Sequence, residues 1–427
     1  MAQPADRPTV LRGARIFDGK SATLVEGRDV LVAGSVIEEL IPAGQAVEGA
    51  QVFDCAGKVV MPGLIDAHWH SILAAAPLPV VMSGSLPYIY LLAAQEAERT
   101  LLRGFTTVRD VGGPAFALKR AIDEGRFAGP RIYPSGAMLS QTSGHGDFRL
   151  PNERPPYAHC AIPMSEVAGL TALADGVPAV LKTAREQLLQ GASQIKIMAG
   201  GGAASAFDPL DTLQYTPDEM RAAVAAAADW GTYVCAHVYT AAGIARCLDG
   251  GVKSIEHGQL ADEEAMRRIA DAGAFWSVQP FLNDDDANPP ATPQQQRDAE
   301  AIARGTVRAI ELGKKHGVKM AFGTDVLFSP ALTATQGKQL TKFVRWFESA
   351  DVLRLATSNA AELLALSGAR NPYPAALGVV AAGAYADLLA IDGDPLRDVS
   401  LLADPEKHLR LVMKGGRIYK DALTAGS

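Results

Sequence analysis

The chain has 427 residues, a formal net charge of −7 at pH 7 and 48% hydrophobic residues. This length exceeds what one ordinary core holds, and it suits an α/β barrel of about 250 residues or more with a small second domain. The acidic balance without a basic block argues against a nucleic-acid partner. No segment approaches the ~18 consecutive apolar residues of a membrane span, so we expect a soluble protein without a membrane partner.

The N-terminus and the cysteines bear on the cellular location. No signal peptide stands at the N-terminus, but residues 2–6 after Met1 resemble the end that remains when an export signal is removed. We therefore expect either a cytoplasmic or an exported, periplasmic protein. The cysteines show no C-x-x-C spacing and are expected to be free thiols; they are Cys55, Cys160, Cys235 and Cys247.

The two ends of the chain share a strand-like texture. From about residue 9 to residue 61, short apolar runs are separated by Gly and Asp turns, and the same pattern returns between residues 387 and 419. Two β-rich ends around a different middle predict one small β-sandwich built from both termini. We assign residues 1–61 and 378–427 to it, and residues 62–377 to a second domain.

The middle of the chain alternates between helical and strand patterns. Eight apolar strands are each separated by a helix or a helix-length segment; they lie at 64–70, 105–109, 131–134, 194–198, 233–237, 253–257, 275–278 and 319–323. Among the helices, Thr216-Pro-Asp-Glu219 has the residues of a capping box. This alternation predicts an α/β fold, a (β/α)8 barrel of the TIM type.

Two stretches interrupt this regularity. Residues 140–163 and 283–293 are long and irregular, as is typical of lids or inserted loops. Within the second, Asp284-Asp-Asp286 is interpreted as a solvated loop rather than a third metal site. The small residues from Gly200 to Ser205 are expected to leave space for a ligand beside Lys196.

Polar residues gather where the predicted strands end, which is where barrel enzymes carry their active sites. His68 and His70 close the first strand and share a face, because alternate residues of a strand point the same way. Lys196 lies in the fourth strand; His237, His257 and Asp325 end the fifth, sixth and eighth. Each alone is more often a core residue or a helix cap. Four of the eight histidines at such positions together favour a metal site.

Lys196 is the most informative member of this group. It stands between Ile195 and Ile197, so it points into the barrel while the isoleucines face the helices. One reading is a buried ion pair with Asp325 or Asp110. The other is a lysine whose lowered pKa lets it react with carbon dioxide, giving a carbamate that can bridge two metals.

The pattern as a whole resembles the amidohydrolase superfamily. The matching residues are Gly63–His70, Lys196, His237, His257 and Gly323–Asp325, while Val60–Gly63 and Gly383–Leu388 resemble parts of that superfamily's composite sandwich. Four segments resemble its prolidase-like branch, which contains Xaa-Pro and Xaa-Arg dipeptidases and ochratoxin-hydrolysing amidases and is related to imidazolonepropionases. These segments are Thr142–Asp147, Lys196–Gly202, Ala236–Tyr239 and Ser254–Gly258.

The resemblance implies a site with two divalent metal ions, expected to be Zn²⁺. His68, His70 and Asp325 would hold one ion and His237 and His257 the other, with carboxylated Lys196 and a hydroxide as bridges. Asp325 would act as general base and then as general acid.

Two further residues are expected to contact the substrate. His145 would act in catalysis by polarising the substrate carbonyl or by binding its carboxylate, and Tyr239 would bind the carboxylate. Arg109 is expected to be structural, paired with Asp110 or Asp66.

The function expected from these features is hydrolysis of the C-terminal amide bond of N-acyl or aminoacyl amino acids. This is a dipeptidase- or carboxypeptidase-like reaction on small substrates with a free carboxylate, and it includes cleavage of ochratoxin A to ochratoxin alpha and phenylalanine. One alternative is ring-opening of a cyclic amide, as in imidazolonepropionases; another is a non-catalytic barrel scaffold. We also expect a homo-oligomer, with the apolar residues 86–92 in a loop at its interface.

Overall fold

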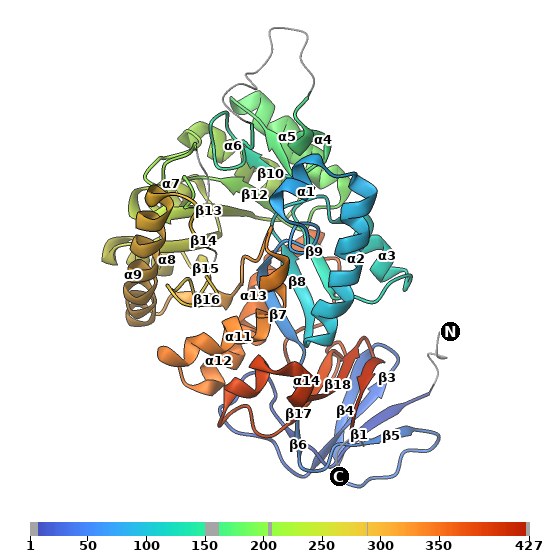
Figure 1. The fold of residues 1–427 in the computed structure, drawn as a ribbon. Coiled ribbons are helices and arrows are strands. Elements are labelled where there is room, and N and C mark those ends of the chain that lie inside the picture. Colours follow the sequence, from blue (N-terminus) through green and yellow to red (C-terminus); the bar gives the residue numbers. More distant parts are fainter. Residues whose placement is uncertain (1–6, 150–161, 204–206, 288, 424–427) are drawn as a thin grey trace.

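The computed structural model describes residues 7–149, 162–203, 207–287 and 289–423. A ring of parallel strands, covered on its outside by helices, forms the larger part of the molecule (Figure 1). The strands from both chain ends lie together beyond one end of this ring (Figure 1). Residues 2–6, which resemble a processed N-terminus, lie outside the described residues, and so does Cys160.

The ring consists of two parallel sheets. The first contains, in spatial order, β7 (Leu64–Trp69), β8 (Phe105–Asp110) and β9 (Arg131–Pro134). The second contains β11 (Thr171–Leu173), β10 (Met138–Ser140), β12 (Ile195–Met198), β13 (Val234–Thr240), β14 (Ser254–Leu260), β15 (Phe275–Val278) and β16 (Lys319–Phe322). All eight strands expected from periodicity are present in the expected order, and the seven-stranded parallel sheet is consistent with a barrel.

Backbone hydrogen bonds connect the two sheets on both sides. The Asp325 amide donates to the His68 carbonyl oxygen at 2.8 Å, which joins the segment after β16 to β7. The Ser193 amide donates to the Pro134 carbonyl oxygen at 2.7 Å, which joins β9 to the start of β12. The first and last strands therefore lie side by side, and the segments that follow them share one edge.

Two short strands, β10 and β11, were not expected from the sequence. Both have three residues, too few for an alternating pattern to stand out. Regular elements border the stretch 140–163, because β10 ends at Ser140 and α4 (Met164–Val167) begins directly after residue 163. Residues 150–161 of this stretch lie outside the described residues.

Helices follow the strands, as the alternating pattern predicts. Thr216 and Glu219 form both hydrogen bonds of the capping box at the start of α6. The helix α9 begins at Pro293, where the Thr292 hydroxyl caps the Gln295 amide. Residues 86–92, expected in a loop, form the first turns of α2. The longer helices are α2 (Leu86–Leu102), α3 (Phe116–Asp123), α5 (Val177–Gln190), α6 (Pro217–Asp229), α7 (Ala241–Gly250), α8 (Glu263–Asp271), α9 (Pro293–His316) and α13 (Ser358–Ala365).

Short helices occupy the remaining connections. They are α1 (Leu78–Ser83), α10 (Pro330–Thr333), α11 (Gln336–Thr341), α12 (Ser349–Leu355) and α14 (Pro405–His408), with 3₁₀ turns at η1 (Lys342–Arg345), η2 (Gly368–Arg370) and η3 (Val399–Ala403).

The chain ends form two further sheets. One is a four-stranded sheet of β4 (Val36–Pro42), β3 (Arg28–Ala33), β1 (Thr9–Arg12) and β5 (Gln51–Asp54). The other is a five-stranded sheet of β19 (Arg417–Asp421), β18 (Leu409–Lys414), β17 (Leu388–Asp392), β6 (Lys58–Pro62) and β2 (Arg15–Ile16), so it combines both ends of the chain. Leu11 and Val30 of the first sheet share a core with Val60 and Leu388 of the second. The interpretation of these sheets as one sandwich domain, and its boundaries, stay predictions.

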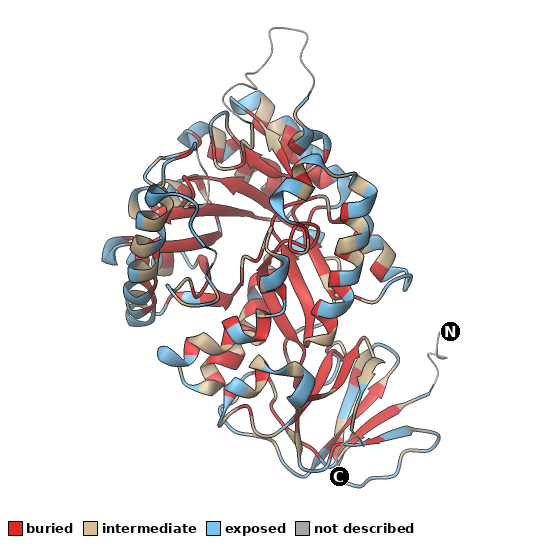
Figure 2. Cartoon of the chain, in the orientation of Figure 1, coloured by how far each residue is buried: buried red, intermediate tan, exposed pale blue. Residues whose placement is uncertain are grey.

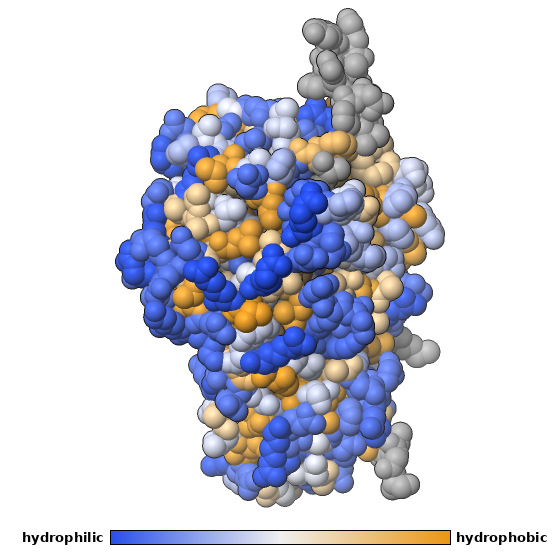
Figure 3. All heavy atoms as spheres, turned by 60° about the vertical axis from the view of Figure 1, so that its left-hand side comes forward, coloured by the Kyte–Doolittle hydropathy of each residue, from blue (hydrophilic) through white to orange (hydrophobic). Residues whose placement is uncertain are grey.

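Burial follows this architecture. The barrel strands are buried almost throughout, whereas the surrounding helices expose their outer faces (Figure 2). One face of the molecule is mostly hydrophilic, with hydrophobic residues scattered across it (Figure 3). Cys55, Cys235 and Cys247 are buried free thiols, as expected. No helix in the described part of the chain is both long and apolar enough to cross a membrane.

An ion pair connects the barrel to the terminal strands. Arg131, the first residue of β9, donates to both carboxylate oxygens of Asp387 at 2.9 and 3.1 Å. Both side chains are largely buried, and the guanidinium lies 3.7 Å from the centre of the Tyr385 ring. Truncating one partner of such a buried pair leaves the other charge without compensation.

We expect Arg131→Ala to lower the free energy of unfolding by about 3 kcal/mol, because it leaves the Asp387 carboxylate buried and without its cation. Urea unfolding followed by tryptophan fluorescence measures the loss. Arg221→Ala is the matched control, because the Arg221–Asp218 pair is exposed and should change stability by less than about 0.5 kcal/mol. Equal unfolding midpoints for both variants would show that the Arg131 pair does not stabilise the fold.

Candidate metal centre

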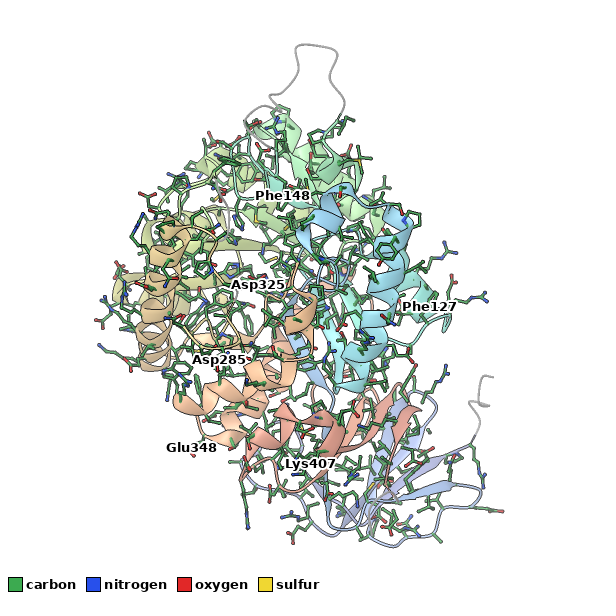
Figure 4. The ribbon with its side chains drawn as sticks, in the orientation of Figure 1. Phe127, Phe148, Asp285, Asp325, Glu348 and Lys407 are labelled. Atoms are coloured by element: carbon green, nitrogen blue, oxygen red, sulfur yellow. The ribbon has the colours of Figure 1, made fainter. Side chains whose placement is uncertain are left out.

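The structure brings all six predicted metal ligands to the same edge of the barrel. His68 is in β7 and His70 directly follows it; Lys196 is in β12, His237 in β13 and His257 in β14. Asp325 follows β16 and lies in the middle of the ring of strands (Figure 4). This convergence arises because parallel strands of a barrel end at one shared face.

Asp325 stands at the centre of the cluster. Its Oδ1 lies 3.1 Å from His68 Nε2 and 3.3 Å from His70 Nε2, and its Oδ2 lies 4.0 Å from His257 Nδ1. His68, His257 and Asp325 each offer one possible ligand atom, and these three atoms lie within 4.8 Å of one another. The His237 and His257 ring centres are 4.5 Å apart. Burial by itself would raise the pKa of Asp325, but the His68 and His70 rings outweigh it and hold that pKa well below its usual value.

Two of these residues have an unusual backbone. His257 has φ = 71° and Asp325 has φ = 57°, in the left-handed region that non-glycine residues seldom adopt. The buried Asp66 carboxylate supports the second, because it accepts hydrogen bonds from the Thr324 amide, the Thr324 hydroxyl and the His68 amide. Strained backbone supported in this way is typical of functional sites.

Hydrogen bonds orient three of the imidazoles. His68 Nδ1 lies 2.8 Å from Glu256 Oε2, His70 Nδ1 lies 3.0 Å from the Gly112 carbonyl oxygen, and His237 Nε2 lies 3.2 Å from the Gly201 carbonyl oxygen. These oxygens can only accept, so each of these nitrogens carries the hydrogen. In the neutral form of each ring, the opposite nitrogen then keeps a lone pair, as it does in metal-binding histidines.

The fourth imidazole, His257, has a buried Nδ1 without a hydrogen-bond partner among the described residues. Such an orphaned polar atom is costly in a protein interior unless a ligand satisfies it. Four imidazoles and a carboxylate are also a donor set that suits zinc and similar divalent metals. The residues present therefore fit a metal centre.

Lys196 is buried at 1% exposure, and this burial lowers the pKa of its ammonium group. Within the described chain, Lys196 forms no ion pair with either of the two expected partners. Asp325 pairs with histidines, and Asp110 accepts hydrogen bonds from the Ser71 and Gly112 amides. The ion-pair reading of Lys196 is thus not what the structure shows.

The partner expected for Arg109 was wrong. Arg109 Nη2 donates to both oxygens of Glu256, at 2.8 and 2.7 Å, rather than to Asp110 or Asp66, and both side chains are fully buried. Burial by itself would raise the pKa of Glu256, but the Arg109 charge and the contacts with His68 together outweigh it and lower that pKa. Glu256 was missed in the sequence. Its signal was an acidic residue inside an apolar strand, beside a predicted ligand.

The two predicted substrate residues also lie at the cluster. The His145 ring stacks on His237 with ring centres 4.0 Å apart, and Tyr239 stacks on His257 at 5.0 Å. Because β13 continues to Thr240, Tyr239 shares a face with His237 as predicted. His145 Nδ1 lies 2.8 Å from Asp208 Oδ2, a partner that the sequence did not reveal.

Two smaller expectations need correction. The space beside Lys196 is filled, because a Cβ on Gly201 would lie 1.9 Å from the Pro209 carbonyl oxygen and one on Gly202 would lie 1.9 Å from His145 Cε1. Ala204 and Ser205 lie outside the described residues. The acidic residues Asp284 and Asp286 are not simply solvated, because both pair with Lys342 at 2.9 and 3.4 Å.

Comparison with known proteins identifies the family of the chain. Residues 59–419 match the model of the amidohydrolase family. The chain is 31% identical over 391 residues to ochratoxinase of Aspergillus niger, covering 85% of this chain and 76% of that one. It is 27% identical over 410 residues to imidazolonepropionase of Deinococcus radiodurans, covering 92% of each chain.

Solved structures lead to the same branch. A prolidase crystallised with N-methylphosphonate-L-proline aligns with a TM-score of 0.89 and 36% identity, covering 97% of this chain and 100% of that one. A Xaa-Pro dipeptidase with bound methionine aligns with a TM-score of 0.82 and 28% identity, covering 97% and 100%. The chain thus belongs to the amidohydrolase family, in its prolidase-like branch, and is a hydrolytic enzyme that acts on amide bonds.

Proposed function

We propose that this protein is a binuclear zinc amidohydrolase that cleaves the C-terminal amide bond of N-acyl or aminoacyl amino acids. The observation that carries the proposal is the Asp325 carboxylate, which lies within 4.0 Å of nitrogens from three imidazoles at the mouth of the barrel. In this proposal residues 62–377 form the catalytic barrel, and residues 1–61 with 378–427 form the supporting sandwich.

His68, His70 and Asp325 would hold one metal ion, and His237 and His257 the other. Bound divalent metals would supply Lewis acidity, which lowers the pKa of water to about 7 and polarises an amide carbonyl. The hydrogen bonds on the outer nitrogens of His68, His70 and His237 support these assignments, since they leave the inner nitrogens free to bind.

Carboxylated Lys196 would bridge the two ions. A neutral lysine amine adds to carbon dioxide and releases one proton, which leaves a carbamate with two oxygens. The burial of Lys196 favours the neutral amine that this step needs. The nearby histidines and the absence of a carboxylate partner in the described chain also support a modified side chain here rather than an ammonium ion.

Asp325 would move the protons of the reaction. As an ionised carboxylate it could accept a proton on Oδ from the attacking water. The same oxygen can then donate that proton to the amide nitrogen, which leaves poorly unless it is protonated. His145 and Tyr239 flank His237 and His257, where they can contact the substrate carbonyl and carboxylate.

The relatives limit the range of substrates. One similar structure holds a proline phosphonate and another holds methionine, and one similar sequence is named ochratoxinase. Amino acids and their analogues therefore fit sites of this kind, which supports a substrate with a free α-carboxylate. Ring-opening of a cyclic amide is the second candidate, because imidazolonepropionases match this chain over most of its length.

We expect amidation of the substrate's C-terminus to lower kcat/KM by about 100-fold. The reason is that a lost charge-assisted hydrogen bond costs up to about 3 kcal/mol. A library of N-acyl amino acids and dipeptides, ochratoxin A included, each paired with its C-terminal amide, provides the measurement. Equal rates for acid and amide would favour the cyclic-amide alternative, and no hydrolysis with any metal added would favour the non-catalytic scaffold.

We expect Lys196→Ala to bind less metal and to lose activity, because it removes the bridging group. Short carboxylic acids such as acetate or propionate should restore part of both by supplying a carboxylate in its place. Metal analysis of the purified protein and initial rates provide the readouts, and Lys182→Ala, an exposed lysine on α5, is the control. Unchanged metal content in Lys196→Ala would contradict the carbamate.

We expect Glu256→Gln to weaken zinc binding 10- to 100-fold, because the neutral amide no longer compensates Arg109 or strengthens His68 as a ligand. Competition with a chelator of known affinity measures the change. Glu264→Gln, on an exposed helix face, serves as the control. A folded Glu256→Gln protein with the wild-type zinc affinity would show that Glu256 does not support the ligand.

A further inference from the structure

A hydrogen-bonded pair of a partly exposed histidine and a buried carboxylate lies beside the proposed metal ligands, outside the ligand set. Asp208 Oδ2 lies 2.8 Å from His145 Nδ1 and accepts a hydrogen bond from the Gly202 amide at 2.9 Å. The Asp208 side chain is 5% exposed, whereas that of His145 is 22% exposed. The carboxylate is therefore held inside the protein, while the imidazole that it contacts reaches the mouth of the barrel.

The position of the His145 ring is fixed on three sides. Its face stacks on His237 with an interplanar angle of 16°, its Nδ1 contacts Asp208, and the ring lies directly over Gly202. A Cβ at position 202 would come within 1.9 Å of His145 Cε1, so only glycine leaves room for the ring there. The segment that carries Asp208 approaches just as closely, against Gly201.

We propose that Asp208 is the positioning residue for His145, and that Gly202 is kept small so that the ring can lie where Asp208 holds it. This inference rests on the proposed function, in which His145 contacts the substrate. Asp208 itself does not touch the reacting atoms in this proposal; it acts through His145.

The hydrogen bonding gives Asp208 a definite effect. Because its Oδ2 already receives the Gly202 N–H, this oxygen is an acceptor, and His145 Nδ1 must be the donor. That arrangement is the same for the neutral and the protonated imidazole. In both, Nδ1 faces Asp208, so the orientation of the ring at the mouth of the barrel is defined.

A double-mutant cycle tests this coupling. Removing Asp208 should release the ring, and misplacement of a contacting group by about 1 Å costs on the order of 100-fold in rate. We expect Asp208→Ala and His145→Gln each to lower kcat/KM by about 100-fold, and the double variant to lose no more than either one. Asp208→Asn should recover at least tenfold, because its amide oxygen can still accept both hydrogens.

Controls separate this role from a general structural one. Asp211→Ala, on the same segment but exposed, should leave kcat/KM within about twofold. Metal content and melting temperature should match the wild type in all variants. Additive losses in the double variant, or an Asp208→Ala variant as active as the wild type, would overturn the inference. If Asp208→Ala fails to fold, Asp208→Asn and Gly202→Ala replace it. Each of them is then combined with His145→Gln, and the losses of kcat/KM in the double variant must again be non-additive.

A second readout needs no substrate. In protein with ¹⁵N-labelled histidine, His145 should show a slowly exchanging Nδ1–H signal, assigned by its loss in His145→Gln. This signal should disappear in Asp208→Ala and persist in Asp211→Ala. Its absence from the wild type would overturn the inference even if the enzyme is active. Its presence with no hydrolysis of any N-acyl amino acid would instead reject the proposed function.

Discussion

The buried ion pair between Arg109 and Glu256 supports the centre of this protein. Both groups are fully buried, and loss of either would leave an uncompensated charge at a cost of about 3–5 kcal/mol. Glu256 spans the interior, because one carboxylate receives hydrogen bonds from Arg109 in β8 and from His68 in β7. The same contact that stabilises the barrel interior therefore also orients a predicted metal ligand.

A second buried carboxylate performs a similar task on the other side. Asp66 joins β7 to the segment after β16 through Thr324 and the His68 amide, and it also accepts from Gln336. This arrangement supports the left-handed backbone at Asp325, which turns the carboxylate toward the imidazoles. The strained residue and its support come from strands that are far apart in the sequence, so the site depends on closure of the barrel.

The histidines differ in how they are held, and the difference matches the roles proposed for them. His68, His70 and His237 each give one hydrogen to an acceptor, which in the neutral ring leaves a lone pair on the opposite nitrogen. His145 instead gives its Nδ1 hydrogen to Asp208 and stacks on His237 from outside the cluster. Its exposure at the mouth suits a residue that meets a substrate rather than one that binds an ion.

The sequence by itself determined the order of the eight barrel strands and the set of groups at their ends. Both depend on local patterns: a strand needs only a short apolar run, and alternate residues share a face whatever their neighbours are. His68, His70 and Lys196 could thus be placed from a few residues around them. The tertiary structure alone decided their partners, because Arg109 and Glu256 are 147 positions apart, and His145 and Asp208 are 63 apart. Pairings over such distances leave no periodic trace, and they exist only once folding has brought the strands together and buried charges that must then be compensated.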